Sequence, residues 1–215
     1  EKFKWSQVLH FSFVTLVALP SFSKVYLSNH LFMQEDIRTR VREWVERNVP
    51  VGAKIALDAP FFMPRLRLTA AQLERKRDEL LSLPNLSRVQ LGRIESLLKA
   101  SEETRQARYE LVFLRRSPQE STFLFSRPNI PYDLNRLKQA GIQYVITRQV
   151  SQDDQSQFYE ELEDGAEFLA KFTPYHDRSR EWPIDRLPLT GGPFLWQELV
   201  ARETNGQVIK VYKLK

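Results

Sequence analysis

The sequence predicts one α/β domain with a mostly parallel sheet and helices on both faces, preceded by a membrane-helix remnant. Short apolar segments suited to buried strands recur between segments of helical periodicity, with tight turns between them. The composition, 42% hydrophobic and 27% charged, is that of an ordinary folded domain. We therefore expect one domain over residues 33–215, with an inserted helical hairpin over 69–108 and an antiparallel hairpin at the C-terminal end.

The N-terminal segment is the most apolar part of the chain, because residues 5–23 contain no charged side chain. As a helix, these 19 residues span roughly 28 Å, close to the hydrocarbon thickness of a bilayer. A terminal transmembrane helix, or its remnant with a linker, is predicted over 1–32, with Lys2 and Lys4 indicating a cytoplasmic start. A signal peptide and a buried helix of a soluble protein are the alternatives. A chain that begins with Glu1 is also expected to be a fragment of a longer one.

The first helix and strand of the domain are predicted over residues 36–48 and 54–58. Apolar residues recur there at helical spacing, with arginines and glutamates between them: Ile37, Val41, Trp44 and Val45. Asn48, Pro50 and Gly52 end the helix, because the residue before proline avoids the helical region and glycine tolerates the turn. The strand that follows is short and apolar, so it needs cover on both faces.

The loop after this strand contains two candidate binding residues, Arg65 and Arg67. If the loop lies at the carboxyl end of the strand, these arginines are placed to contact anionic lipid headgroups or a lipid-linked phosphate. The alternative is that the loop covers an edge of the core with its apolar side chains, Phe61, Phe62 and Met63.

The insertion over 69–108 has the signals of two helices. Thr69 with Gln72, and Ser87 with Gln90, each have the spacing of a capping box. Between residues 65 and 116, 12 basic residues outnumber 7 acidic ones. This excess is typical of a solvated helical face, or of attraction to an anionic membrane surface or a lipid-phosphate substrate. No nucleic-acid partner is expected, because no helix-turn-helix, zinc or aromatic RNA-binding signature accompanies the charge.

Strands and helices alternate again in the second half. Strands are predicted over 109–114, 144–147 and 168–172, and Asp133 and Gly141 are expected to begin and end a short helix. Ser151 and Asp154 have capping-box spacing before another helix. Asn205-Gly206 predicts a hairpin that joins strands at 195–202 and 208–214, although Leu195 and Leu199 also fit a helical turn.

Few residues suggest chemistry. The chain has no cysteine, which excludes disulfides, thiol chemistry and thiolate metal sites. It has no glycine-rich phosphate loop, nucleophile elbow or histidine pair at ligand spacing, so no catalytic residue, cofactor or metal ligand is predicted. Asp58 ends a strand where α/β enzymes often keep a catalytic group. The group from Tyr175 to Arg178 could form a site, but its position after a strand favours a polar loop. Asp153-Asp154 could be paired carboxylates, but their position at a predicted helix start favours capping.

Three segments together resemble the soluble C-terminal domain of dolichyl-phosphate-mannose protein mannosyltransferase-like integral membrane glycosyltransferases. The first is the run Trp44, Val45, Asn48, Pro50, Gly52, Lys54, Ile55, Ala56, Asp58. The second is Ala140, Gly141, Ile142, Gln143, Tyr144, Val145, Ile146, and the third is Gly206, Gln207, Val208, Ile209, Lys210, Val211, Tyr212. The resemblance covers most of residues 33–215.

Members of this family transfer a sugar from a polyprenyl-phosphate carrier to an acceptor, with an acidic catalytic residue in the first extracytoplasmic loop. No segment of this chain corresponds to that loop. The resemblance therefore implies a non-catalytic domain on the extracytoplasmic side that covers a membrane-embedded active site. Its implied partners are the rest of its own membrane domain, the lipid bilayer, the lipid-linked sugar and the acceptor. The main alternative is a single-span or exported interaction domain with no enzymatic activity. A third possibility is a complete soluble α/β enzyme, which requires a pocket with convergent polar groups at the strand ends.

Overall fold

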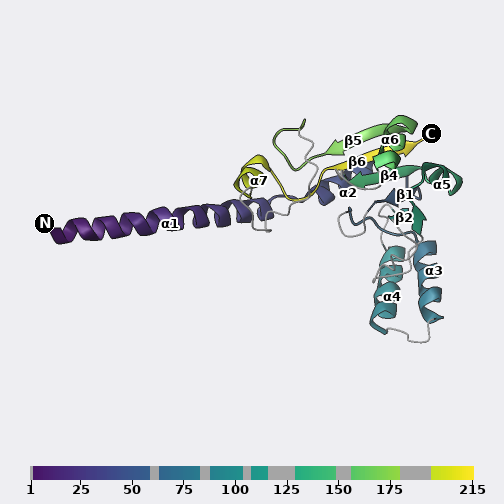
Figure 1. The fold of residues 1–215 in the computed structure, drawn as a ribbon. Helices are drawn as coiled ribbons and strands as arrows, with labels where there is room; N and C mark the ends of the chain where they lie inside the picture. Colours follow the sequence, from purple (N-terminus) through teal and green to yellow (C-terminus); the bar gives the residue numbers. More distant parts are fainter. Residues whose placement is uncertain are drawn as a thin grey trace.

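The protein is described by a computed structural model that covers residues 2–58, 63–82, 88–103, 108–115, 129–148, 156–179 and 195–215. Its centre is a six-stranded sheet with the strand order β3-β2-β1-β4-β6-β5 (Figure 1). The strands are β1 (Lys54–Leu57), β2 (Glu110–Arg115), β3 (Asn129–Pro131), β4 (Tyr144–Arg148), β5 (Ala166–Phe172) and β6 (Ile209–Leu214).

The first four strands are parallel, and β6 runs antiparallel to both β4 and β5. The predicted fold class, a mostly parallel sheet with an antiparallel C-terminal pair, is therefore confirmed.

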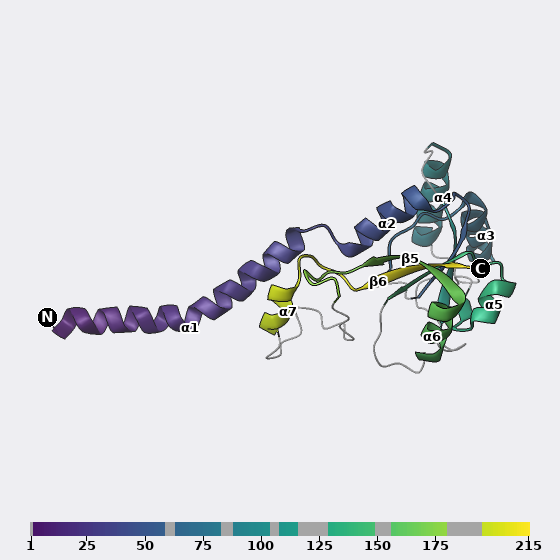
Figure 2. The same ribbon diagram turned by 90° about the horizontal axis from the view of Figure 1, so that it is seen from above.

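Helices cover both faces of the sheet, as the apolar strands require (Figure 2). Helix α2 (Ile37–Asn48) covers one face, where its buried side chains Ile37, Val41 and Val45 meet β1, β2, β4 and β6. Helices α5 (Leu134–Gln139) and α6 (Ser156–Gly165) cover the other, where Leu137 and Leu162 are fully enclosed. Alternate residues of the four central strands, β1, β2, β4 and β6, enter the two cores.

Local signals in the sequence set the ends of these elements. The Asp36 carboxylate accepts a hydrogen bond of 2.8 Å from the amide of Arg38 at the start of α2. Asp133 caps α5 in the same way, through the amide of Arg136 at 3.0 Å. Gly52 has φ +83°, a left-handed conformation that other residues adopt with strain, and it forms the predicted turn between α2 and β1.

The predicted helical hairpin is present as α3 (Ala70–Leu81) and α4 (Arg88–Glu103), which lie side by side and project from the sheet (Figure 1). Thr69 caps α3 by accepting from the amide of Gln72, but the reciprocal half of the capping box does not form. The Gln72 side chain instead bonds the backbone of Leu111 in β2. The second predicted box includes Ser87, which lies outside the described residues, as do Ser151 and Asp154.

The predicted strand over 195–202 is wrong, because residues Leu195–Ala201 form helix α7. Asn205-Gly206 is therefore not a hairpin turn, and β6 pairs with β5 and β4 instead. Gly206, with φ +122°, serves a close approach: a Cβ at this position would lie 2.8 Å from the Cβ of Ile37. The dipeptide favours a hairpin turn locally, but helix α7 before it and the contact of Gly206 with Ile37 of α2 decide the structure here.

Helix α1 (Lys2–Met33) extends away from the sheet, and the two chain termini lie at opposite ends of the molecule (Figures 1 and 2). Eight large apolar side chains between residues 13 and 26 are 58–72% exposed: Phe13, Val14, Leu16, Val17, Leu19, Phe22, Val25 and Tyr26.

Within the described residues, no helix combines the length and the apolar character that a membrane crossing requires.

Candidate functional site at the carboxyl edge of the sheet

The carboxyl ends of β1 and β4 meet at the point where the strand order reverses direction. From β1 the chain continues to β2 and β3 on one side, and it then returns to β4 on the other side. Open α/β sheets bind their ligands outside the strand ends at such a point. Asp58 directly follows β1, and Arg148 is the last residue of β4. These two residues define the candidate site.

The Asp58 carboxylate is only 2% exposed, and hydrogen-bond donors reach both of its oxygens. The hydroxyl of Tyr159 on α6 donates to Oδ2 at 2.9 Å, and the backbone amide of Arg148 donates to the same oxygen at 3.2 Å. The hydroxyl of Tyr132, just after β3, donates to Oδ1. A buried carboxylate requires such partners, because an unpaired charge is costly in the interior.

The Tyr159 hydroxyl stays protonated at neutral pH. Burial raises the pKa of Tyr159, and the nearby Asp58 carboxylate and Tyr132 raise it further, while Arg148 opposes the shift. The rings of Tyr132 and Tyr159 both pack edge-on against Phe158, with centroids 5.3 Å and 5.5 Å from it. These contacts therefore hold α6 and the segment after β3 against Asp58 at the end of β1. In this arrangement Asp58 is an acceptor for fixed donors.

A second buried polar cluster lies between α7 and the segment that follows β5. Glu198 and Arg202 are 2% and 6% exposed, and Arg202 Nε bonds Glu198 Oε2 at 3.1 Å. Arg202 also bonds the Tyr175 hydroxyl at 3.1 Å and the carbonyl of Gly206 at 2.8 Å. The sequence interpretation of Tyr175 to Arg178 as a polar loop missed this buried tyrosine. The Glu-x-x-x-Arg spacing, which places the two charges on one helix face, was the available signal.

The predicted lipid or phosphate contacts, Arg65 and Arg67, are exposed. The carbonyl of Arg67 accepts the amide of Tyr109 at 2.9 Å, so this part of the loop lies at the amino ends of the strands. The prediction that this loop lies at the carboxyl edge of the sheet is therefore wrong for Arg67.

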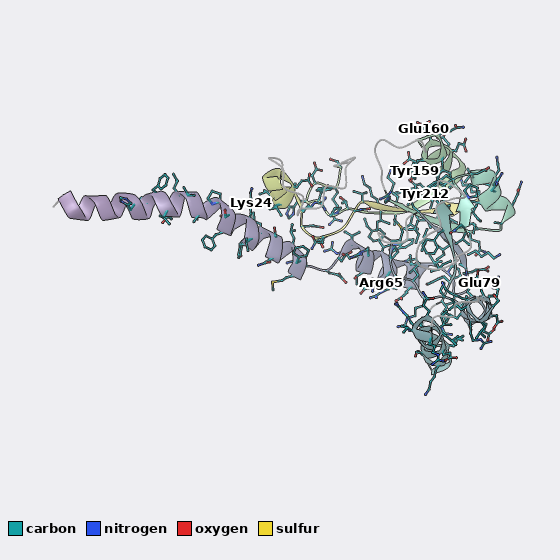
Figure 3. The ribbon with its side chains drawn as sticks, turned by 60° about the horizontal axis from the view of Figure 1, so that its bottom comes forward. Lys24, Arg65, Glu79, Tyr159, Glu160 and Tyr212 are labelled. Atoms are coloured by element: carbon teal, nitrogen blue, oxygen red, sulfur yellow. The ribbon has the colours of Figure 1, made fainter. Side chains whose placement is uncertain are left out.

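Figure 3 places Arg65 and Tyr159 on opposite sides of the sheet, and neighbouring Met63 is buried in the core beneath α2. Met63 thus covers the core edge, as the alternative reading proposed. Phe61 and Phe62 lie outside the described residues.

Within the described ranges, no group of three or more carboxylate or histidine side chains is placed to hold a metal ion. Comparison of the chain with protein-family models, curated proteins and solved structures gives no match.

Proposed function

We propose that this chain is the non-catalytic α/β domain of a membrane-associated glycosyltransferase that uses a polyprenyl-phosphate sugar. The domain is held at the bilayer by α1, on the extracytoplasmic side, and covers an active site formed by the rest of the protein. The observation that carries this proposal is the exposed apolar surface around α1.

The exposed apolar side chains of α1 point in all directions around the helix axis. At 100° per residue, Phe13, Val14, Leu16 and Phe22 fall in four different quadrants, and each is more than 60% exposed. A helix that is apolar on every side needs apolar surroundings, and patches of this extent mark interaction sites. A lipid bilayer supplies such surroundings for a segment without charged side chains. The proposal does not depend on α1 crossing the bilayer by itself.

The glycosyltransferase part of the proposal rests on the three segments of the resemblance. They contribute β1, β4 and β6, which are adjacent strands at the centre of the sheet. Segments roughly 60 to 80 residues apart in the sequence thus form one contiguous unit of the sheet, which is the arrangement that the resemblance requires.

Vesicle flotation tests the membrane association. The chain is expected to float with neutral phosphatidylcholine vesicles, and the double variant Val14→Asp, Val17→Asp is expected to remain in the dense fraction. The matched control is the double variant Val51→Asp, Val89→Asp, since these valines are also well exposed, at 71% and 83%, but lie in the α/β domain. If the α1 variant floats as well as the control, α1 does not anchor the protein.

Sugar transfer is measured in membranes from cells with and without the native gene, supplied with radiolabelled polyprenyl-phosphate sugar. Loss of transfer on deletion is expected. Unchanged transfer together with α1-dependent flotation would replace the proposal by the alternative, an anchored interaction domain without enzymatic activity.

A further inference from the structure

We infer that the carboxyl edge of the sheet, with Asp58 and Arg148, faces the lipid bilayer, while the amino edge faces water. This orientation rests on the proposed membrane association and goes beyond it, because association alone would allow any face of the domain to lie against the membrane. Three observations carry it: which strand ends share an edge, how α1 is attached, and where the opposite edge lies.

Four elements end or begin at the same edge of the sheet. β1 and β4 are parallel neighbours, so Asp58 and the end of β4 lie together, and the amide of Arg148 bonds the Asp58 carboxylate. In the antiparallel part, Ile209 at the start of β6 pairs with both Arg148 and Phe172, the last residue of β5. The segments before β6 and after β5 therefore leave the sheet on the side of Asp58.

Those segments fix α1 to this edge. Thr204 donates its hydroxyl proton to the carbonyl of Glu35, just after α1, and the amide of Ile37 bonds the carbonyl of Asn205 at 3.0 Å. Helix α7 packs against α1, and Leu31 near the end of α1 is buried. Contacts from several elements hold α1, so its direction relative to the sheet is set by packing and not by a free linker.

The buried Glu198–Arg202–Tyr175 cluster stiffens this joint. Residues 174–176 and 201–204 pair through backbone hydrogen bonds, including the amide of His176 to the carbonyl of Ala201 at 3.0 Å. The Arg202 guanidinium lies 5.0 Å from the centroid of the Tyr175 ring and bonds Glu198. These contacts fix α7, against which α1 packs, to the segment that follows β5.

The amino edge lies at the far end of the molecule from α1. The turn at Val51 and Gly52 precedes β1 there, and β6 ends there beside Gln143. Figures 1 and 2 both show the C-terminus, after β6, at the end of the molecule opposite to the N-terminus of α1. When lipid surrounds α1, the carboxyl edge is therefore the nearer of the two edges to the membrane.

Single-cysteine labelling tests this orientation, because these 215 residues contain no cysteine. His176→Cys places a bimane probe in the exposed turn beside α7 at the carboxyl edge, and Val51→Cys places one in the exposed turn at the amino edge. Each labelled full chain is bound to vesicles that carry nitroxide on the lipid headgroup. The probe at position 176 is expected to lose fluorescence, and the probe at position 51 is expected to keep it.

Each outcome decides the inference. Equal quenching at the two positions, or stronger quenching at 51, overturns the orientation while α1-dependent flotation still supports the proposed membrane association. Failure of the unmodified chain to float with vesicles overturns the association and the orientation together. Circular dichroism of each labelled variant, compared with the unmodified chain, establishes that the probe has not altered the fold.

Discussion

Replacing Gln72 by methionine tests whether its side chain completes the edge of β2. Among the described residues, the short strand β3 pairs with Phe113 to Arg115, and no strand pairs with Leu111 on that side. The Gln72 amide takes the place of a strand: its nitrogen donates to the Leu111 carbonyl and its oxygen accepts the Leu111 amide, both at 2.9 Å. Both residues are buried, at 7% and 4% exposure, so water cannot replace these bonds without opening the structure.

Methionine has a volume similar to that of glutamine, but its side chain can bond neither the amide nor the carbonyl of Leu111. The substitution therefore leaves two buried backbone groups unpaired. At about 1–3 kcal/mol for each unsatisfied group, the free energy of unfolding is expected to fall by about 2–6 kcal/mol. The assay is urea unfolding followed by circular dichroism, with hydrogen exchange at the Leu111 amide as a local measurement. Gln72→Glu keeps the acceptor but loses the donor, and it is expected to be at least as destabilising, because its carboxylate faces the Leu111 carbonyl.

The matched control is Gln157→Met, because Gln157 is an exposed glutamine whose amide bonds only Glu161 on the same helix. Its effect is expected to be within about 0.5 kcal/mol. Equal stability of the Gln72→Met and Gln157→Met variants, with unchanged protection of the Leu111 amide, would refute the role of Gln72 as a surrogate strand.

Three further predictions concern other parts of the fold. Burial, and then the charge of Glu46, raise the pKa of Tyr109 to about 12. The protonated Tyr109 hydroxyl therefore contributes fully to the free energy of unfolding below pH 10, and this contribution is lost between pH 10 and about 12. Tyr109→Phe should remove this decrease from the pH profile of the free energy of unfolding. Gly206→Ala should lower the free energy of unfolding by about 1–3 kcal/mol, because it adds both backbone strain at positive φ and a steric contact with Ile37. Gly52→Ala, which has open space around it, should lower it by about 1–2 kcal/mol through strain alone. Equal melting temperatures of the two variants would contradict a steric contact between position 206 and Ile37. Arg202→Met should lower the free energy of unfolding by about 3–5 kcal/mol, because it leaves the buried carboxylate of Glu198 without its ion-pair partner. In the same urea titration, Arg47→Met, which removes an exposed ion pair, should lower it by less than about 1 kcal/mol.

The sequence by itself determined the elements whose signals are local. The apolar spacing of Ile37, Val41 and Val45 predicted α2 and its buried face, because helical periodicity depends only on neighbouring turns. Asp133 and Gly52 fixed a helix start and a turn through contacts within a few residues. The short apolar segments predicted a sheet covered on both faces. These inferences succeeded because the residues that cause each structure lie within the segment itself.

The tertiary structure decided every feature that depends on distant partners. Gln72 has the spacing of a capping box, yet its side chain bonds a residue 39 positions away, because β3 is too short to complete the edge of β2. The sequence places Asp58 at a strand end that could carry a catalytic group, but it does not reveal the partners of Asp58, which lie 74, 90 and 101 positions along the chain. Asn205-Gly206 favoured a hairpin, but the packing of α7 and the approach of Gly206 to Ile37 overrode it. In each case the competing interaction forms only once the strand order has brought separate segments together, and no local pattern encodes that order.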